Sequence, residues 1–206
     1  AISTLQEVDL IAVEDTRKTR IILKAFNIKK TTTSYHEHNE IEKANELVLL
    51  IKSGKNIALV SDAGTPGISD PGYRLVKAAH SYNIPVIGIP GPSSLTTALS
   101  ISGLPTDHFY FEGFLPRKKG RLTRMKFLSK LFATVIIFES PFRLIKTLND
   151  IQTHFGNRIV SVCREMTKIH EEVFRGSIWK TLNYFNEKPT IKGEVIILVA
   201  KEDYDE

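Results

Sequence analysis

The sequence predicts an α/β protein, and three observations support this fold class. Apolar runs of about four to eight residues, a length suited to buried strands, alternate along the chain with longer amphipathic segments of helical period. Loops rich in glycine and proline follow several of these runs. The 206 residues are 42% hydrophobic, which is enough for the core of one large domain or two small ones. No apolar run reaches the roughly 20 residues of a membrane helix, so we expect no membrane span.

The first half of the chain alternates helices with short strands. A basic helix carries an apolar face made by Ile21, Ile22 and Phe26. Asn39 is placed to cap a long amphipathic helix, which Gly54 ends. The expected strands are 10–13, 31–35, 57–60 and 85–89, and the expected helices are 2–8, 17–26, the segment after Asn39, 73–82 and 95–101.

A break at residues 103–107, which contains Gly103 and Pro105, predicts the boundary between domains 1–104 and 105–206. The second domain opens with an aromatic strand, and a basic loop and helix follow it. The expected strands are 109–114, 134–138, 159–163, 172–175 and 194–200, and the expected helices are 121–131, 142–154 and 177–185.

Two loops stand out because each follows an expected strand and opens an expected helix. They are residues 60–72, VSDAGTPGISDPG, and residues 90–94, PGPSS. Carboxyl ends of adjacent parallel strands share one edge of a sheet, so we expect the two loops to converge on a ligand site. The first loop lacks the Gly-Lys-Ser/Thr end of a P-loop and the GxGxxG pattern, which favours a neutral or zwitterionic ligand. A long connection without a ligand is the alternative, although such connections usually take about two to six residues.

The net charge of +5 is concentrated in two acid-free segments. Residues 17–30 contain six basic side chains and residues 117–130 contain seven. These segments favour a polyanionic partner over the alternative of solvated helix faces. The single cysteine, Cys163, lies in an apolar segment and predicts a buried thiol in a reducing cytoplasm. The six histidines form no ligand-spaced cluster with it, so we expect no metal site.

Eight short strings carry a resemblance to a known family, and they span nearly the whole chain. They are AVEDTRKTR (12–20), HEHNE (36–40), SDAGTPGISDPGY (61–73), IPGPSSLTTALSISGLP (89–105), FEGFLPRKKGR (111–121), FESPFR (138–143), CREMTKIHEE (163–172) and KGEVIILV (192–199). In this order they resemble the tetrapyrrole-methylase superfamily of S-adenosylmethionine (SAM) enzymes, and within it the branch that methylates ribosomal RNA.

The resemblance implies two α/β lobes with SAM in the cleft between them, and a homodimer. It implies methyl transfer to the 2′-hydroxyl of cytidine 1402 of 16S rRNA in the small ribosomal subunit (30S). The family's first strand would precede Ala1. Gly64-Thr65-Pro66 stands where other branches have Gly-Asp-Pro. By the same resemblance the SAM-binding residues are Gly64, Thr65, Pro66, Ile68, Ser93, Ser94, Phe138, Met166, Glu194 and Val195.

Methyl transfer from a sulfonium chiefly requires alignment of the two reactants and a dry site. A ribose hydroxyl is a weak nucleophile, so a base or a cation near the developing alkoxide would help. The candidates are three pairs at strand ends, and a structural salt bridge is the alternative for each pair. In order of preference they are Asp15 with Arg17, Glu139 with Arg143, and Glu165 with Lys168.

The basic segment around residue 120 predicts contacts with rRNA phosphates through Lys118, Lys119, Arg121 and Arg124. His36 and His38 are interpreted as capping or surface residues. Two other functions stay open: a SAM-dependent methylase of a tetrapyrrole or another small molecule, and a non-catalytic rRNA-binding factor.

Overall fold

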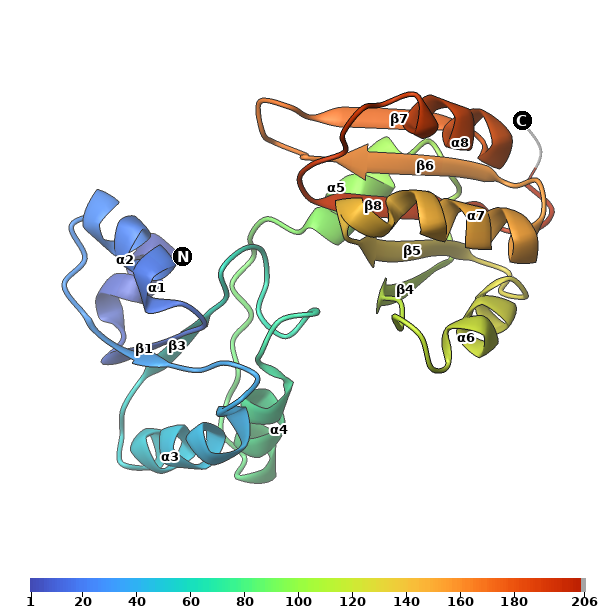
Figure 1. Ribbon diagram of the computed structural model, residues 1–206. Coiled ribbons are helices and arrows are strands. Elements are labelled where there is room, and N and C mark those ends of the chain that lie inside the picture. The colour runs from blue at the N-terminus through green and yellow to red at the C-terminus, as the bar shows by residue number, and fades with distance from the viewer. Residues whose placement is uncertain (205–206) are drawn as a thin grey trace. The chain divides into compact units, whose positions relative to one another are not determined.

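The computed structural model describes residues 1–204 and divides into two compact units, Ala1–Ser93 and Ser94–Glu206 (Figure 1). The α/β class is confirmed. The first unit contains α1 (Ile2–Glu7), β1 (Leu10–Val13), α2 (Thr16–Ala25), β2 (Thr31–Ser34), α3 (Glu40–Lys52), β3 (Ile57–Val60) and α4 (Tyr73–Ser81).

The sheet of the first unit is parallel and has the order β2-β1-β3. Val13 at the end of β1 pairs with Ser34 on β2 and with Val60 on β3, so the three carboxyl ends lie side by side. In a parallel sheet this edge is where ligands bind. The loops that leave it are therefore the first place to look for a site.

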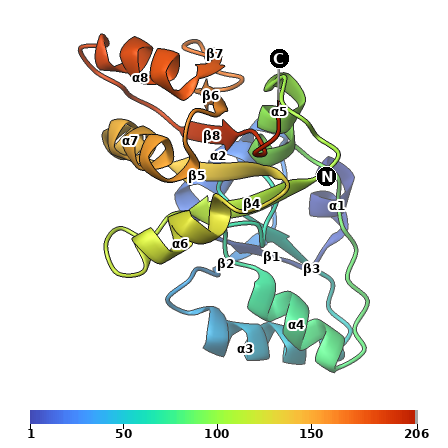
Figure 2. The same ribbon diagram turned by 90° about the vertical axis from the view of Figure 1, so that its right-hand side faces the viewer.

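Side chains alternate between the two faces of this sheet and bury it on both sides. Ile11 and Val13 pack with Leu23 of α2, while Ala12 packs with Leu47 of α3 on the opposite face. Figure 2 shows α3 and α4 together on one side of the sheet. Burial on both faces explains why β1 is apolar throughout, where a half-exposed strand would alternate.

Tyr35 connects the end of β2 to the start of α4. Its side chain is fully buried, and its hydroxyl accepts a hydrogen bond from the backbone N–H of Leu75 at 3.1 Å. Gly72, at the N-cap of α4, has no side chain to accept that bond. Tyr35 therefore caps a helix that follows it by about 40 residues, and it anchors the loop before α4.

The second unit contains a five-stranded mixed sheet with the order β4-β5-β8-β6-β7. Only β4 and β5 are parallel, and the other neighbours are antiparallel. Its elements are α5 (Ser94–Ile101), β4 (Phe109–Phe114), α6 (Arg121–Leu128), β5 (Thr134–Glu139), a 3₁₀ turn (Pro141–Arg143), α7 (Leu144–Phe155), β6 (Ile159–Arg164), β7 (Glu172–Ser177), α8 (Ile178–Asn186) and β8 (Val195–Val199).

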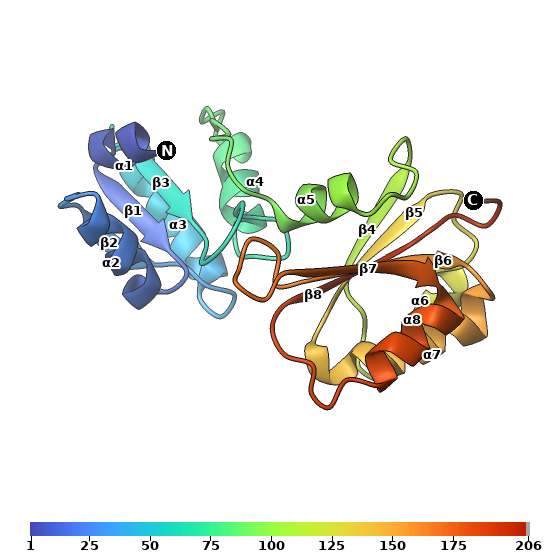
Figure 3. The ribbon, with the colours of Figure 1, turned by 90° about the horizontal axis from the view of Figure 1, so that it is seen from above.

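Helices cover both faces of the second sheet. Figure 3 shows α6, α7 and α8 on one face and α5 on the other. Ala98 and Leu99 of α5 pack with Ile196 and Leu198 of β8. The packing thus groups α5 with the second sheet, whereas the sequence analysis placed its residues in domain 1–104.

The expected strand at 85–89 is wrong: residues 84–93 are irregular in the structure. A strand exists only where a partner accepts its hydrogen bonds, and β3 pairs with β1 alone in the described residues. Pro85 and Pro90 also remove two backbone donors. Ile87 is consequently 80% exposed.

The proposed cap at Asn39 is half correct. Asn39 occupies the N-cap position of α3, yet its side chain makes no capping hydrogen bond. Its Oδ1 accepts from the backbone N–H of His36 at 2.8 Å, and its Nδ2 donates to the Ser34 carbonyl. Asn39 therefore closes the turn before the helix. Among residues 1–204, no helix is long and apolar enough to cross a membrane.

Candidate functional site

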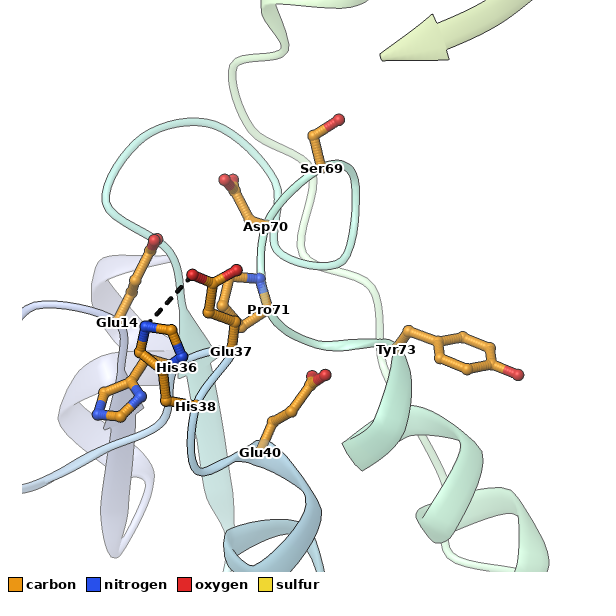
Figure 4. Close-up of a pocket in the computed structure, with 9 residues that line it drawn as sticks. All are labelled: Glu14, His36, Glu37, His38, Glu40, Ser69, Asp70, Pro71 and Tyr73. Carbon is orange, nitrogen blue, oxygen red and sulfur yellow. Dashed lines mark ion pairs between the residues drawn. The ribbon is translucent and has the colours of Figure 1, made fainter. Parts of the chain in front are cut away.

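A cavity of about 460 Å³ opens at the carboxyl edge of the first sheet. Its walls come from the end of β1 (Glu14), the turn after β2 (residues 36–38), the start of α3 (Glu40), and residues 69–73 between β3 and α4. Figure 4 shows the carboxyl groups of Glu14, Glu37 and Asp70 turned toward a common space. The cavity lies where the strand order places a ligand site.

The ends of β1 and β3 are tied together by a reciprocal set of hydrogen bonds. The backbone N–H of Asp15 donates to Asp62 Oδ1 at 3.1 Å, and the N–H of Asp62 donates to Glu14 Oε2 at 3.1 Å. Lys18 Nζ donates to the other oxygen of Asp62 at 2.7 Å. Asp62 therefore holds this edge together, a role that the sequence analysis did not assign to it.

Asp15 and Arg17 lie together as expected, beside this network. Asp15 caps α2 by accepting from the backbone N–H of Arg17, and its carboxylate also accepts from the guanidinium at 2.8 and 3.0 Å. The Arg17 side-chain hydrogen bond, with its backbone bond and charge, lowers the pKa of Asp15 to about 2. A carboxylate with so low a pKa is a weak base, so this geometry suits orientation of Arg17. The catalytic role of the pair stays a prediction.

Asp70 has the opposite electrostatic environment. Burial, followed by the charge of Glu14, raises the pKa of its carboxyl, while a hydrogen bond with Ser61 opposes the rise. The preceding residue, Ser69, has a left-handed φ of 63°, which is uncommon for a residue with a side chain. Asp70 is not among the site residues predicted from the sequence. Its signal was the repeated Ser-Asp of residues 61–62 and 69–70 within one loop.

The two loops contact each other, as expected, and a ligand site shared by both stays a prediction. The Thr65 hydroxyl donates to the carbonyl of Pro92 at 3.5 Å, and a Cβ placed on Gly64 would lie 3.6 Å from the same oxygen. Gly64, Thr65 and Ile68 are exposed, Pro66 is half-buried, and Ser93 follows Pro92 directly. The loop residues expected to bind SAM in this unit are therefore close together, and their contact with SAM stays a prediction.

In the second unit, Glu139 and Arg143 belong to a buried network. Arg143 donates to Glu139 Oε1 at 2.6 Å, and the other carboxylate oxygen accepts from Thr147 at 2.7 Å. Arg121 donates to Thr147 at 2.7 Å and also pairs with Asp150 at 2.7 Å. The Glu139 side chain is 0% exposed. This network of hydrogen bonds and ion pairs therefore holds α6 and α7 to the end of β5, which is a structural role.

Glu165 and Lys168 close the tight loop after β6. Lys168 Nζ lies 2.9 Å from Glu165 and 3.2 Å from Glu194. The backbone N–H of Glu194 donates to the Glu165 carboxylate, which lowers its pKa together with the bond from Lys168. Glu165 has a left-handed φ of 50° and lies against Gly193, where a Cβ would overlap its side chain. The expected pair forms, and it shapes this loop.

The other residues expected to bind SAM in the second unit are placed as follows. Phe138 is half-buried, and its ring centroid lies 4.9 Å from that of Phe111. Met166 packs at the edge of the core, and the Glu194 side chain is 75% exposed. Val195 is 3% exposed and packs in the core, on a strand that is paired with β5 and β6. That one SAM molecule contacts residues of both units stays a prediction.

The basic side chains of residues 117–130 fall into two groups: some are exposed to solvent, and others form hydrogen bonds or ion pairs within the protein. Lys118 and Lys119 are exposed in the loop before α6. Arg121 is 7% exposed in the network described above, and Arg124 pairs with Glu112 at 2.7 Å. The two lysines are therefore placed to meet a phosphate, whereas the guanidinium groups of Arg121 and Arg124 are held by their own chain.

Cys163 is buried, and burial raises the pKa of its thiol to about 11. A thiol with that pKa is inert at neutral pH, which agrees with the expected structural role. No group of three or more potential metal ligands occurs in the described residues.

Comparisons with known proteins agree with the resemblance noted in the sequence. Ribosomal RNA small subunit methyltransferase I of Thermotoga maritima is 46% identical over 202 residues, which are 98% of this chain and 91% of that protein. The protein of the same name from Synechocystis sp. is 49% identical over 97% of this chain and 72% of its own length. A crystal structure of diphthine synthase superposes with a TM-score of 0.72 at 15% identity, covering 97% of this chain and 82% of that one, which supports the fold alone.

The family model of the tetrapyrrole (corrin/porphyrin) methylases matches residues 1–180. This match covers both loops and most of the second sheet. The chain is therefore a member of the tetrapyrrole methylase family.

Proposed function

We propose that this protein is a SAM-dependent methyltransferase that methylates the ribose 2′-hydroxyl of cytidine 1402 of 16S rRNA in the small ribosomal subunit. The observation that carries the proposal is identity of 46% over 98% of the chain to a small-subunit rRNA methyltransferase. SAM is the methyl donor, and small-subunit rRNA is the acceptor. The homodimer and the cytoplasmic location follow from the resemblance and are part of the proposal.

The binding of SAM is assigned to the residues expected from the sequence. Gly64, Thr65, Pro66 and Ile68 belong to a loop that contacts residue 92, next to Ser93, which makes a compact surface of backbone groups. Such groups suit the zwitterionic end of SAM, since they donate and accept hydrogen bonds without a net charge. Ser94, Phe138, Met166, Glu194 and Val195 complete the proposed set.

The RNA is held by cations outside the cavity. The residues that line the cavity include no Lys or Arg, whereas Arg17 and Lys18 pair with Asp15 and Asp62, and Lys118 and Lys119 are exposed on the second unit. Phosphate contacts of this kind set affinity and register without reading bases. Arg17 is the proposed phosphate clamp, and Asp15 orients it through two hydrogen bonds.

Transfer of label from methyl-labelled SAM tests the proposal. The natural full-length protein is incubated with unmodified 30S subunits, with uroporphyrinogen, or with a precorrin. We expect label only in 16S rRNA, and nuclease digestion with mass spectrometry should locate it on the ribose of cytidine 1402. Label only in a tetrapyrrole would reject the proposal. Absence of heat in calorimetry with SAM would favour a non-catalytic rRNA-binding factor.

A further inference from the structure

The cavity in the first unit has the chemistry of a site for a neutral group that donates hydrogen bonds. Glu14, Glu37, Glu40 and Asp70 supply four carboxyl groups to its walls. A phosphate would be repelled by these charges, whereas hydroxyl and amino groups would find acceptors. His36 also lines the cavity, and its buried Nδ1 has no hydrogen-bond partner in the described residues. A nucleoside carries hydroxyl and amino groups, which can donate hydrogen bonds to these carboxylates.

Three of the four carboxyl groups already form an ion pair or accept a hydrogen bond from the backbone. Glu40 pairs with Arg74 at 2.8 Å, and the exposed Glu37 lies 3.4 Å from His38. Glu14 accepts from the backbone N–H of Asp62. Within residues 1–204, Asp70 forms no ion pair, and its hydrogen bond is to the Ser61 hydroxyl. Glu14 likewise forms no ion pair in the described residues, but a backbone N–H engages its carboxylate, whereas the partner of Asp70 is a hydroxyl.

Asp70 also lies next to the expected cofactor loop. It follows Ile68 by two residues, and the same loop contacts residue 92 through Thr65. Tyr35 holds the next helix, α4, through Leu75, which fixes the end of the segment that carries Asp70. The carboxyl group is therefore held on a supported loop, with the cavity on one side and the proposed SAM-binding residues shortly before it in sequence.

We propose that Asp70 accepts the proton of the ribose 2′-hydroxyl when that hydroxyl attacks the methyl group. This inference rests on the proposed function. The O–H bond breaks and its proton moves to a carboxylate oxygen of Asp70. An electron pair of the ribose oxygen forms the new O–CH₃ bond, and the S–CH₃ bond of the co-substrate SAM breaks to leave S-adenosylhomocysteine. Asp70 then releases the proton to water.

The surroundings of Asp70 suit this role. Burial and the charges of Glu14 and Asp62 raise its pKa, which makes it a stronger base than an ordinary aspartate. Other titratable groups line the same cavity, and Lys18 pairs with Asp62. The lining groups are His36, Glu37, His38, Glu40 and Tyr73. The ionised form of Asp70 is active, so turnover should rise with pH through its raised pKa and then level off.

The test compares two changes at Asp70 in the natural full-length protein. Asp70→Asn keeps the size of the side chain and removes the base, so single-turnover methylation of 30S subunits should fall by about 10²–10⁴-fold. SAM affinity by calorimetry and the KM for 30S subunits should stay nearly unchanged. Asp70→Glu keeps a carboxyl and should methylate more slowly than the parent while retaining the rising limb of the pH profile. Asp9→Asn is the matched control, because Asp9 lies at the opposite end of β1 and pairs with Lys55.

The outcomes separate this inference from the proposed function. A parent protein that fails to methylate 30S subunits overturns both. If the parent is active and the Asp70→Asn variant is equally active, the role of Asp70 alone is overturned. The same holds if the Asp70→Asn variant keeps the rising limb of the pH profile. Loss of SAM binding in Asp70→Asn would also overturn it, because a proton acceptor is not needed for binding. Should Asp70→Asn fail to fold, an Asp70→Glu variant with parental rate would refute the proposal by itself.

Discussion

The replacement Glu139→Gln distinguishes the two roles that the sequence left open for Glu139. Its carboxylate is 0% exposed and bonds to Arg143 at 2.6 Å, to Thr147 at 2.7 Å and to the N–H of Ser140 at 2.7 Å. A structural role predicts that the second unit loses stability and that the folded enzyme keeps its turnover. A catalytic role predicts the reverse.

The magnitude follows from the contacts that are lost. Removal of one member of a buried ion pair costs about 3–5 kcal/mol, because it leaves the other charge without its partner. The Arg143 side chain is 24% exposed and water can reach part of it, so we expect the lower end, about 3 kcal/mol. With an m-value of about 2 kcal/mol/M, the urea midpoint should fall by about 1.5 M.

Tryptophan fluorescence during urea unfolding measures this change in the correct unit. Trp179 is the single tryptophan of the chain, and it lies on α8 in the second unit. Its signal therefore reports the unit that contains Glu139. The exposed Glu187, next to the end of α8, provides a control: Glu187→Gln should change the free energy of unfolding by less than about 0.5 kcal/mol.

A normal urea midpoint together with lost methylation, at a urea concentration where the protein is folded, would refute the structural role of Glu139. That result would return Glu139 to the reacting groups. A lowered midpoint with parental turnover below the transition would confirm the structural role.

Three further predictions concern single features. Tyr35→Phe leaves the buried N–H of Leu75 without an acceptor and should cost about 1–3 kcal/mol in the first unit, measured by hydrogen exchange in α4; unchanged exchange there would contradict the capping role. The double change Lys118→Ala with Lys119→Ala should reduce the slope of log affinity for 30S rRNA against log salt by about 1.5, and an equal slope would remove both residues from the interface. Cys163 should resist alkylation by iodoacetamide at pH 7.5 in the folded protein and react only in denaturant, since its thiol is buried and its pKa is about 11; rapid reaction without denaturant would contradict this burial.

The local pattern of apolar and polar residues determined most of the secondary structure and the positions of the two loops along the chain. β1, β3 and β4 have the predicted bounds, because short apolar runs between polar turns leave few alternatives. The segment 85–89 has the same kind of pattern and forms no strand in the described structure. Strand formation depends on a partner at the right distance, and that information is absent from the segment itself.

Residue type at strand ends correctly indicated where charged groups gather, and tertiary structure decided what those groups do. Asp15 and Asp70 carry the same side chain, yet the pKa of Asp15 is lowered by Arg17 two residues away, while that of Asp70 is raised by burial and by Glu14. Glu14 and Asp70 are far apart in sequence and meet because β1 and β3 are parallel neighbours. Burial and distance depend on chain segments that local sequence cannot bring together, so the electrostatics of each carboxyl group emerge only in the folded protein.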